Sequence, residues 1–421
     1  MTPPSSWLLN RPRRLWLAAI SLMALLALAW LSYQGIRYFA EPDMLGSRTI
    51  TPGAIDLRNR FLEARTWFAG GGPVYRIYRD AIYPPASYAL FGAVFHALNW
   101  GATKVLWFVL SLVSVSMLSW QLVRHSLARQ RHEQVFLGLM PFAFYATGAA
   151  LGNGQLVLFV LPLALNAVLL LDRAPLTPGR LWLGSLLMLL ALVQPAIAAP
   201  FFWLVLLRAP GFRPGALVVS AYLALTAFAL TFQIEAFRKL RGDADGASVF
   251  GTWSRRAQGG SAIGSMKGGY GTVHNLLGSL RIKGWNMPVS IAILLLLGGW
   301  IYRNRRADLW LLLGVTAIVA RIWTYHRWYD DLLLLLPLIS LFRITRLPSH
   351  GPRIKTLAAV LFVWIWLFLL APGVLYLLPS PGWLIGLQVA GWIAALGLLV
   401  VVVERDRAVQ PQLPAADGPG C

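Results

Sequence analysis

Apolar runs separated by short polar gaps recur along the chain from Leu15 almost to Val403. Runs of this kind predict α-helices that cross a bilayer, because a helix satisfies its own backbone hydrogen bonds in lipid. We therefore expect an all-α polytopic membrane protein with about twelve spans. The predicted spans cover residues 15–33, 104–123, 135–150, 156–171, 180–194, 196–208, 215–233, 287–303, 308–322, 329–343, 355–378 and 383–403.

Basic residues cluster in the short gaps between the apolar runs, and positive charge in short loops favours the cytoplasmic side. Placing every cluster on that side makes residues 84–100 a non-spanning helix on the outer surface. It also divides residues 181–207 into a hairpin that turns at Gln194 and Pro195. Both termini are then cytoplasmic. The clusters are Arg11, Arg13 and Arg14; Arg124, Arg129 and Arg131; Arg173 and Arg180; Arg208 and Arg213; Arg303, Arg305 and Arg306; Arg343, Arg346, Arg353 and Lys355; Arg405 and Arg407.

The same pattern predicts one transmembrane domain over residues 1–408, followed by a disordered tail over residues 409–421. Two long outer loops interrupt the domain, at residues 34–103, which include the interfacial helices, and at residues 234–286. The only cysteine, Cys421, allows neither a disulfide within the chain nor a cysteine metal site.

Composition agrees with a membrane class, since 57% of the 421 residues are hydrophobic and only 13% are charged. The net charge of +21 could indicate a nucleic-acid partner. The basic residues are instead spread among the short gaps, as membrane topology and anionic headgroups require. We expect the lipid bilayer as a partner and no nucleic acid.

The first outer loop carries charges of both signs beside an apolar bundle. Its stretch Ile55–Phe68 predicts an amphipathic helix lying on the membrane, with Asp56, Arg60 and Glu63 on its polar side. The apolar side has Leu57, Phe61, Ala64 and Phe68. Asp56 has two interpretations: an N-cap of this helix, or a general base near the bilayer surface.

Other polar residues gather at the predicted outer ends of the spans, while the middles of the spans hold almost no ionisable residues. Proton-coupled transporters usually place carboxylates or histidines at mid-membrane, so this pattern favours one outer site instead. The residues at the outer ends are Gln34, Asn153, Gln155, Gln194, Gln233, Asn275 and Arg321 through Asp331.

Two of these segments have competing interpretations. Tyr325–Asp331 is either an interfacial cap, or a site where His326 with Arg327 or Arg321 binds an anionic phosphate. Adjacent Asp330 and Asp331 are typical of helix-dipole partners rather than of a metal site. Asn153-Gly154-Gln155 is either a turn or a clamp for sugar hydroxyls. Tyr83-Pro84-Pro85 opens the next helix.

The order of these features resembles glycosyltransferase family 87, membrane enzymes of the GT-C superfamily that include polyprenol-phosphate-mannose-dependent α-mannosyltransferases. The chain departs from the family's usual pattern at Gln194, where a lysine is common, and after Asn275, where a fuller Asn-Gln-Ser run is common. The resemblance covers most of residues 56–336 and rests on Asp56; Gly71-Gly72 before Tyr75; Tyr83-Pro84-Pro85; Gly154-Gln155-Leu156-Val157; Gln194-Pro195; Asn275-Leu276-Leu277; and His326 with Tyr329 before a leucine-rich span.

The resemblance implies a GT-C-like fold and transfer of a sugar, mannose in the family, from a polyprenyl-phosphate sugar to a glycan or glycolipid hydroxyl. It implies the outer face of the bacterial inner membrane as the place of reaction, and neither metal nor cofactor. Asp56 would be the general base and His326 would act at the donor phosphate. Further candidate substrate contacts are Arg58, Arg60, Glu63, Tyr83, Asn153, Gln155, Gln194, Asn275, Arg321 and Arg327.

Two other functions fit the sequence. One is another envelope-glycan enzyme, of the O-antigen ligase or polymerase type, which tends to place its long loop late in the chain and to use a pyrophosphate donor. The other is a lipid or solute transporter. The early loop around Asp56 favours the transferase over the ligase.

Overall fold

The computed structural model describes residues 6–40, 53–69, 72–78, 81–239, 249, 251–254, 271–282, 284–370 and 382–409, and these ranges contain helices but no strand. The predicted tail after Val409, Gly71 of the family resemblance, residues 41–52 of the first predicted outer loop and much of the second, at residues 234–286, lie outside the described residues. The helices are α1 (Ser6–Phe39), α2 (Ile55–Phe68), α3 (Val74–Ile77), α4 (Pro85–Phe95), α5 (Trp100–His125), α6 (Arg131–Ala143), α7 (Tyr145–Asn153), α8 (Val157–Leu171), α9 (Pro178–Ala191), α10 (Pro195–Arg208), α11 (Arg213–Lys239), α13 (Val273–Ser279), α14 (Asn286–Arg303), α15 (Leu309–Ile322), the 3₁₀ helix η1 (Trp328–Leu334), α16 (Leu335–Arg346), α17 (Pro352–Leu370) and α19 (Gly382–Val409).

Six described helices are long and apolar enough to cross a membrane: α1, α5, α11, α14, α17 and α19. The pair α6 and α7 adds a seventh if it counts as one span. The chain is therefore a multi-pass membrane protein, as expected. The remaining apolar helices, α4, α8, α9, α10 and α15, have 11 to 15 residues each. That is shorter than the roughly 20 residues that a hydrocarbon core requires, so the count of twelve spans stays a prediction.

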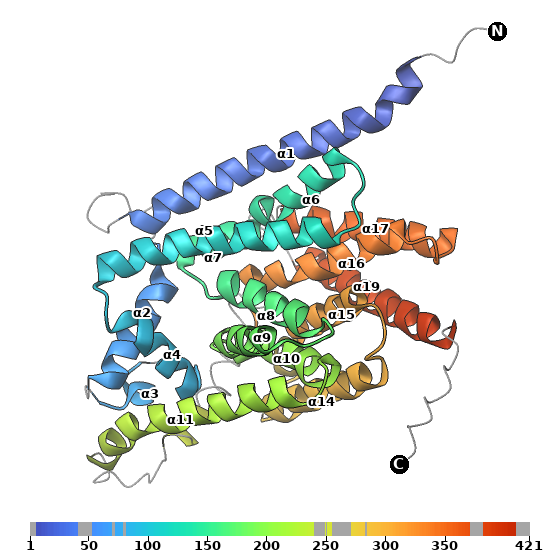
Figure 1. Ribbon diagram of the computed structural model, residues 1–421. Helices are drawn as coiled ribbons and strands as arrows, with labels where there is room; N and C mark the ends of the chain where they lie inside the picture. Colours follow the sequence, from blue (N-terminus) through green and yellow to red (C-terminus); the bar gives the residue numbers. More distant parts are fainter. Residues whose placement is uncertain are drawn as a thin grey trace, which may run out of the picture.

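The short helices α8 and α15 lie in the middle of the molecule, between α1 and α11 (Figure 1). Every residue of α15 from Leu309 to Arg321 is buried. In the most apolar stretches of the six long helices, by contrast, only 11% to 33% of the residues are buried. Exposed leucines on the long helices are suited to contact lipid, and the protein itself covers most of α8 and α15.

Proline and glycine set several helix ends as the sequence predicts. The helix breaks where the hairpin turn was expected, since α9 ends at Ala191 and α10 begins at Pro195. Pro85 opens α4, which is too short to span, and Gly154 ends α7 in the left-handed conformation at φ 71°.

The predicted span over residues 135–150 is not one straight helix, because the chain bends by 41° between α6 and α7, and whether the bent pair is one span stays a prediction. The bend follows Pro141, which lies inside α6 and lacks the N–H that a continuous helix needs. The predicted span over residues 329–343 also differs, because it begins with the 3₁₀ helix η1. The last predicted residues of the span at 355–378 lie outside the described residues.

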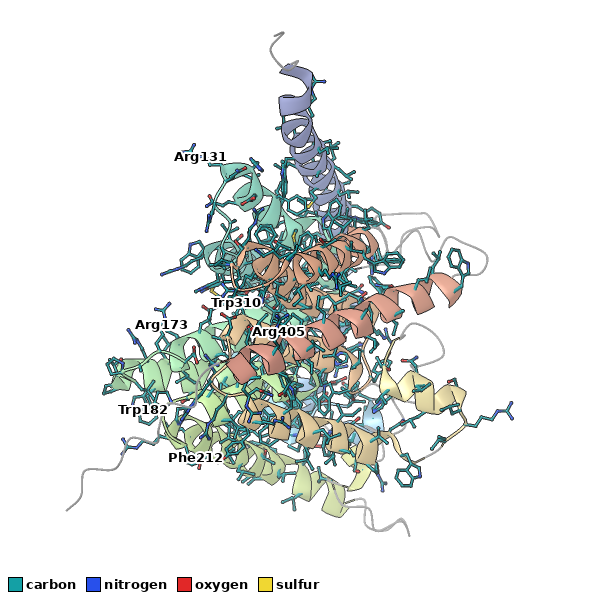
Figure 2. The ribbon with its side chains drawn as sticks, turned by 90° about the vertical axis from the view of Figure 1, so that its right-hand side faces the viewer. Arg131, Arg173, Trp182, Phe212, Trp310 and Arg405 are labelled. Atoms are coloured by element: carbon teal, nitrogen blue, oxygen red, sulfur yellow. The ribbon has the colours of Figure 1, made fainter. Side chains whose placement is uncertain are left out.

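One end of the bundle collects the basic gaps, and we call it the basic end. Arg208 pairs with Asp172 and donates to the carbonyl of Arg305. Arg343 donates to the carbonyl of His125 at 2.7 Å and to Asp308 at 2.8 Å, and Arg346 pairs with Glu133. Figure 2 views this end, with Arg131, Arg173 and Arg405 labelled. The structure thus places these basic loops at one end of the bundle. The distribution of positive charge in the sequence had predicted that they lie on the same side of the membrane.

Candidate functional site

The opposite end of the bundle, which we call the polar end, begins where three segments meet around the start of α2. The amide of Gly53 donates to the carbonyl of Arg37 at 3.0 Å, and that of Ala54 to the carbonyl of Gly152 at 2.8 Å. A side chain at Gly154 would lie 2.7 Å from Cβ of Leu57. The end of α1, the start of α2 and the turn between α7 and α8 are therefore in contact.

This contact places Asp56 beside Gln155. Asp56 is half-buried in the first turn of α2, and its Oδ2 accepts a hydrogen bond from Nε2 of Gln155. The N-cap interpretation is wrong, because Ala54 occupies the cap position and no side chain caps the helix there. The carboxylate is instead oriented by an amide from a segment about one hundred residues away in the chain.

Asn153 has a different role from Gln155. Its Oδ1 accepts a hydrogen bond from Arg37, which also donates to Oε1 of Gln34 at 2.9 Å. Asn153 thus ties the turn to α1, whereas Gln155 contacts Asp56. The segment is both a turn, as one interpretation held, and the support of the candidate base.

The polar side of α2 is buried, which corrects the expectation of a helix lying on the membrane with that side exposed. Glu63 is 1% exposed and Arg60 is 7% exposed, and their ion pair measures 2.7 Å. Tyr88 of α4 donates its hydroxyl to Glu63 at 2.9 Å. Because α4 covers this side and supplies a donor, the charges stay inside the protein. Arg58 lies on the exposed side of α2.

Tyr83 connects this cluster to the other half of the site. The guanidinium of Arg60 lies over its ring, 4.7 Å from the centroid. Burial raises the pKa of Tyr83, Arg60 lowers it, and the carboxylates of Asp56, Glu63 and Asp330 raise it further. Carboxylates from α2 and from η1 therefore both act on one phenol.

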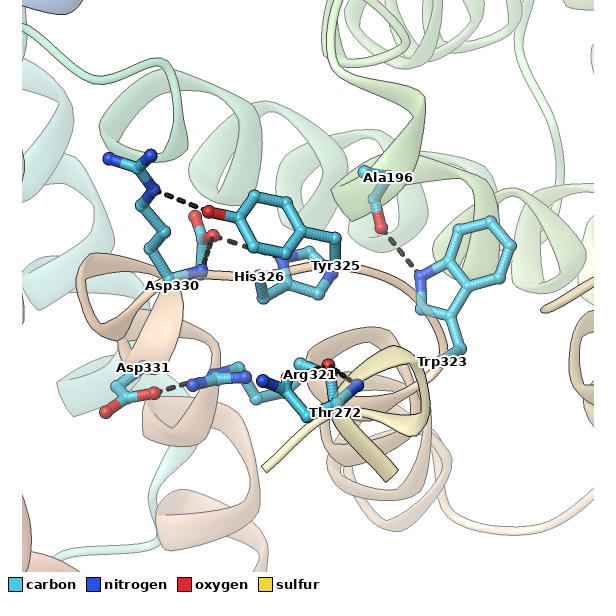
Figure 3. A network of polar contacts seen from close by, with 10 residues as sticks. Ala196, Thr272, Arg321, Trp323, Tyr325, His326, Asp330 and Asp331 are labelled. Carbon is cyan, nitrogen blue, oxygen red and sulfur yellow. Dashed lines mark hydrogen bonds and ion pairs between the residues drawn. The ribbon is translucent and has the colours of Figure 1, made fainter. Parts of the chain in front are cut away.

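The second half of the site is the segment between α15 and α16 (Figure 3). His326 is 1% exposed, and its Nδ1 lies 3.1 Å from Oδ2 of Asp330. The same oxygen accepts the backbone N–H of Arg327 at 3.1 Å. A carboxylate can only accept, so Nδ1 of His326 carries the proton. Nε2 is buried and has no hydrogen-bond partner in the part of the chain that the structure describes.

Arg327 is exposed, and its Nε donates to the hydroxyl of Tyr325 at 2.6 Å. Burial alone would lower the pKa of this guanidinium, but the phenols of Tyr329 and Tyr325 and the carboxylate of Asp56 raise it above its ordinary value. Asp56 and Arg327 thus lie within electrostatic reach of each other.

Arg321 is fully buried and pairs with Oδ1 of Asp331 at 2.6 Å. Its guanidinium also lies 4.9 Å from the ring centroid of Trp392 in α19. The pair ties α15 to η1 and α19, so Asp331 already balances the charge of Arg321. The described residues contain no group of three His, Cys, Asp or Glu side chains that could hold a metal ion.

Three amides have different surroundings. Gln194 precedes α10, and its Oε1 is buried with no hydrogen-bond partner among the described residues. Asn275 in α13 is in contact with Thr272, which caps that helix. Gln233 accepts from the amide of Val74 at 3.1 Å and donates to the carbonyl of Trp67 at 3.2 Å, and so holds α2 and α3 against α11.

Sequence reasoning missed two residues, Tyr88 and His274. Tyr88 lies 25 residues after the carboxylate to which it donates, and no spacing rule links them. His274 is 4% exposed in α13, and its Nε2 lies 2.8 Å from Oγ of Ser290. The sequence did offer one indication of His274, because it directly precedes Asn275, which was already a candidate substrate contact.

The polar end therefore combines a half-buried carboxylate held by an amide, an imidazole held by a carboxylate, and an exposed guanidinium. Such a set can accept a proton at one point and hold an anion at another. Comparison of the chain with protein-family models, with curated proteins and with solved structures finds no match.

Proposed function

We propose that the chain is an integral-membrane glycosyltransferase of the GT-C type that takes a sugar, mannose by the resemblance, from a polyprenyl-phosphate donor. The acceptor is a hydroxyl of a glycan or glycolipid on the outer face of the bacterial inner membrane. The observation that carries the proposal is the placement of Asp56. Its carboxylate is held by Gln155 and lies within electrostatic reach of Arg327 and Tyr83.

In the proposed reaction, Asp56 takes the proton of the acceptor hydroxyl, and the hydroxyl oxygen attacks the anomeric carbon of the donor sugar. The bond from that carbon to the phosphate oxygen breaks, and the lipid phosphate departs with the electron pair. Arg327 offsets the charge that develops on the phosphate, and His326 does so in its doubly protonated form, in which Nδ1 donates to Asp330 and Nε2 donates to the phosphate.

The remaining charged candidates have supporting roles in this proposal. Arg60, paired with Glu63, lies over the ring of Tyr83 and fixes it, and Arg321 with Asp331 fixes the segment that carries His326. The exposed side of α2 alternates apolar Ile55 and Leu62 with basic Arg58 and Arg65, which suits an interface between lipid tails and anionic headgroups.

The test is replacement of Asp56 by Asn in the purified full chain, supplied with a polyprenyl-phosphate sugar and cell-envelope acceptors. We expect transfer to fall by about 10² to 10⁴-fold, the usual contribution of a positioned general base. The matched control is Asp172→Asn at the basic end, which also exchanges a carboxylate for an amide and should keep its transfer rate.

Retained transfer by Asp56→Asn would refute the general-base assignment. Transfer only from a pyrophosphate-linked donor would favour a ligase or polymerase. Proton-coupled uptake of a solute into proteoliposomes, without transfer, would favour a transporter.

A further inference from the structure

His274 has a fixed tautomer. Its Nε2 lies 2.8 Å from Oγ of Ser290 and 3.2 Å from the carbonyl oxygen of Asn286. The hydroxyl of Ser290 has one proton, which it donates to the carbonyl of Trp323 at 2.7 Å. Ser290 must therefore accept from His274, so the ring proton is on Nε2 and Nδ1 carries a lone pair.

That lone pair is buried and has no hydrogen-bond partner within the described ranges. Native proteins seldom leave a buried acceptor unpaired, because such a group loses its hydration without compensation. Burial lowers the pKa of His274 to about 4, the carbonyl of Asn286 raises it, and His326 lowers it. The ring is therefore neutral at physiological pH, and Nδ1 can only accept.

His274 belongs to the surroundings of His326. Through Ser290 it is connected to the carbonyl of Trp323, three residues before His326. The indole of Trp323 in turn donates to the carbonyl of Ala196 at 2.7 Å, two residues after Gln194 (Figure 3). Gln194 carries a second buried acceptor without a partner among the described residues. The two acceptors thus belong to segments, α13 and the start of α10, that are connected by hydrogen bonds to Trp323 of the His326 segment.

The chemistry of these acceptors restricts what can occupy the place. A phosphate dianion offers no proton to a neutral ring nitrogen, and a metal ion lacks the three described His, Cys, Asp or Glu ligands that would hold it. A hydroxyl group has the proton that the lone pair requires. A sugar offers several hydroxyls next to the carbon that bears the phosphate.

We propose that His274 is a further substrate-binding residue, whose Nδ1 accepts a hydrogen bond from a sugar hydroxyl beside the phosphate site of His326 and Arg327. The inference rests on the proposed function and extends it. His326 and Arg327 contact the phosphate, whereas His274 contacts the sugar.

The test compares two amides in the purified full chain. Asn places its Oδ1 near the position of the imidazole Nδ1, and Gln places its amide near the position of Nε2. His274→Asn thus keeps the proposed acceptor and loses the bond to Ser290, while His274→Gln does the reverse. A purely packing role for His274 predicts that the Asn variant is the weaker binder, and substrate binding predicts the opposite.

We expect His274→Gln to raise the Kd for a polyprenyl-phosphate sugar by about 10-fold or more, because one hydrogen bond to a buried acceptor is lost. His274→Asn should stay within a few-fold of the wild type. Binding is measured by calorimetry without acceptor, so it does not depend on transfer. Polyprenyl phosphate without a sugar is the control ligand, and its Kd should be the same in all three proteins.

The sugar hydroxyl that donates to His274 can belong to the donor or to the acceptor, and binding and kinetic measurements distinguish the two cases. A raised donor Kd assigns it to the donor sugar. An unchanged donor Kd with a raised KM for the glycan acceptor assigns it to the acceptor sugar. If His274→Gln binds both substrates as tightly as the wild type does, this inference is overturned and the proposed function stands. The same holds if the substitution weakens binding of the sugar-free lipid as much as binding of the lipid-linked sugar. If the wild type binds no polyprenyl-phosphate sugar, the proposed function is overturned together with this inference.

Discussion

The two ends of the bundle use their carboxylates differently. At the basic end, Asp172, Asp308 and Glu133 each accept from an arginine of another helix or gap. At the polar end, Glu63 and Asp331 also pair with arginines, but Asp56 accepts from an amide and Asp330 accepts from an imidazole and a backbone N–H. An arginine balances the charge of a carboxylate, and an amide or an imidazole orients it. The basic end thus connects helices, and the polar end adds two carboxylates that an amide and an imidazole orient.

Arg321 and Asp331 test this contrast most severely, because they form an ion pair of the structural kind at the polar end. Both side chains are fully buried. Arg321→Met leaves a buried carboxylate unpaired, and we expect a loss of about 3–5 kcal/mol in the free energy of unfolding. The measurement is reversible denaturation in mixed micelles.

The double variant Arg321→Met with Asp331→Leu serves as the control for that prediction. It removes both charges and should recover much of the lost stability. If the double variant is no more stable than Arg321→Met, the loss does not come from an unpaired carboxylate.

Asp308 tests the basic end. It accepts from the amides of Trp310 at 2.9 Å and Leu311 at 3.2 Å, and it also pairs with Arg343. Asp308→Ala should cost about 2 kcal/mol of stability, from the lost cap and the lost ion pair, with transfer per folded molecule unchanged. Asp308→Asn keeps the cap and should cost about half as much. A large loss of transfer at full folding would mean that the basic end takes part in the reaction.

Gln155 tests whether the orientation of a carboxylate matters at the polar end. Gln155→Ala removes the donor that holds Asp56, and we expect transfer to fall about 10-fold with little change in donor affinity. The matched control is Gln121→Ala, which removes another buried amide contact, the 2.6 Å bond to Asn166 between α5 and α8. That variant should lose stability but not turnover. Equal turnover losses in the two variants would contradict the positioning role of Gln155.

The smallest expected effect is a pH dependence from His274. Its pKa falls from an ordinary value of 6.5 to about 4 in the folded chain, chiefly through burial. The unfolded chain therefore binds more protons in this window. The stabilisation is complete above pH 6.5 and is lost as the pH falls towards 4. His274→Asn should show a shallower loss of thermal stability between pH 6.5 and pH 4. Parallel curves for the two proteins would contradict this prediction.

The sequence by itself determined the local parts of the fold. It predicted α2 with its observed bounds, the helix break at Gln194 and Pro195, and the start of α4 to within one residue, at residue 84 instead of Pro85. Proline, glycine and hydrophobic periodicity act over a few residues, so they can be interpreted without knowledge of the fold. Charge also predicted that the basic gaps share one side, because that rule depends on charge and loop length rather than on contacts.

Only the tertiary structure decided the partners within the site. Nothing in the sequence showed that α4 would bury Glu63 or that Gln155 would hold Asp56, because these pairs are 25 and 99 residues apart. The tautomer of His274 likewise depends on Ser290 and on a carbonyl from another segment. Hydrogen bonds are short and directional, so their partners are fixed only when the helices have packed.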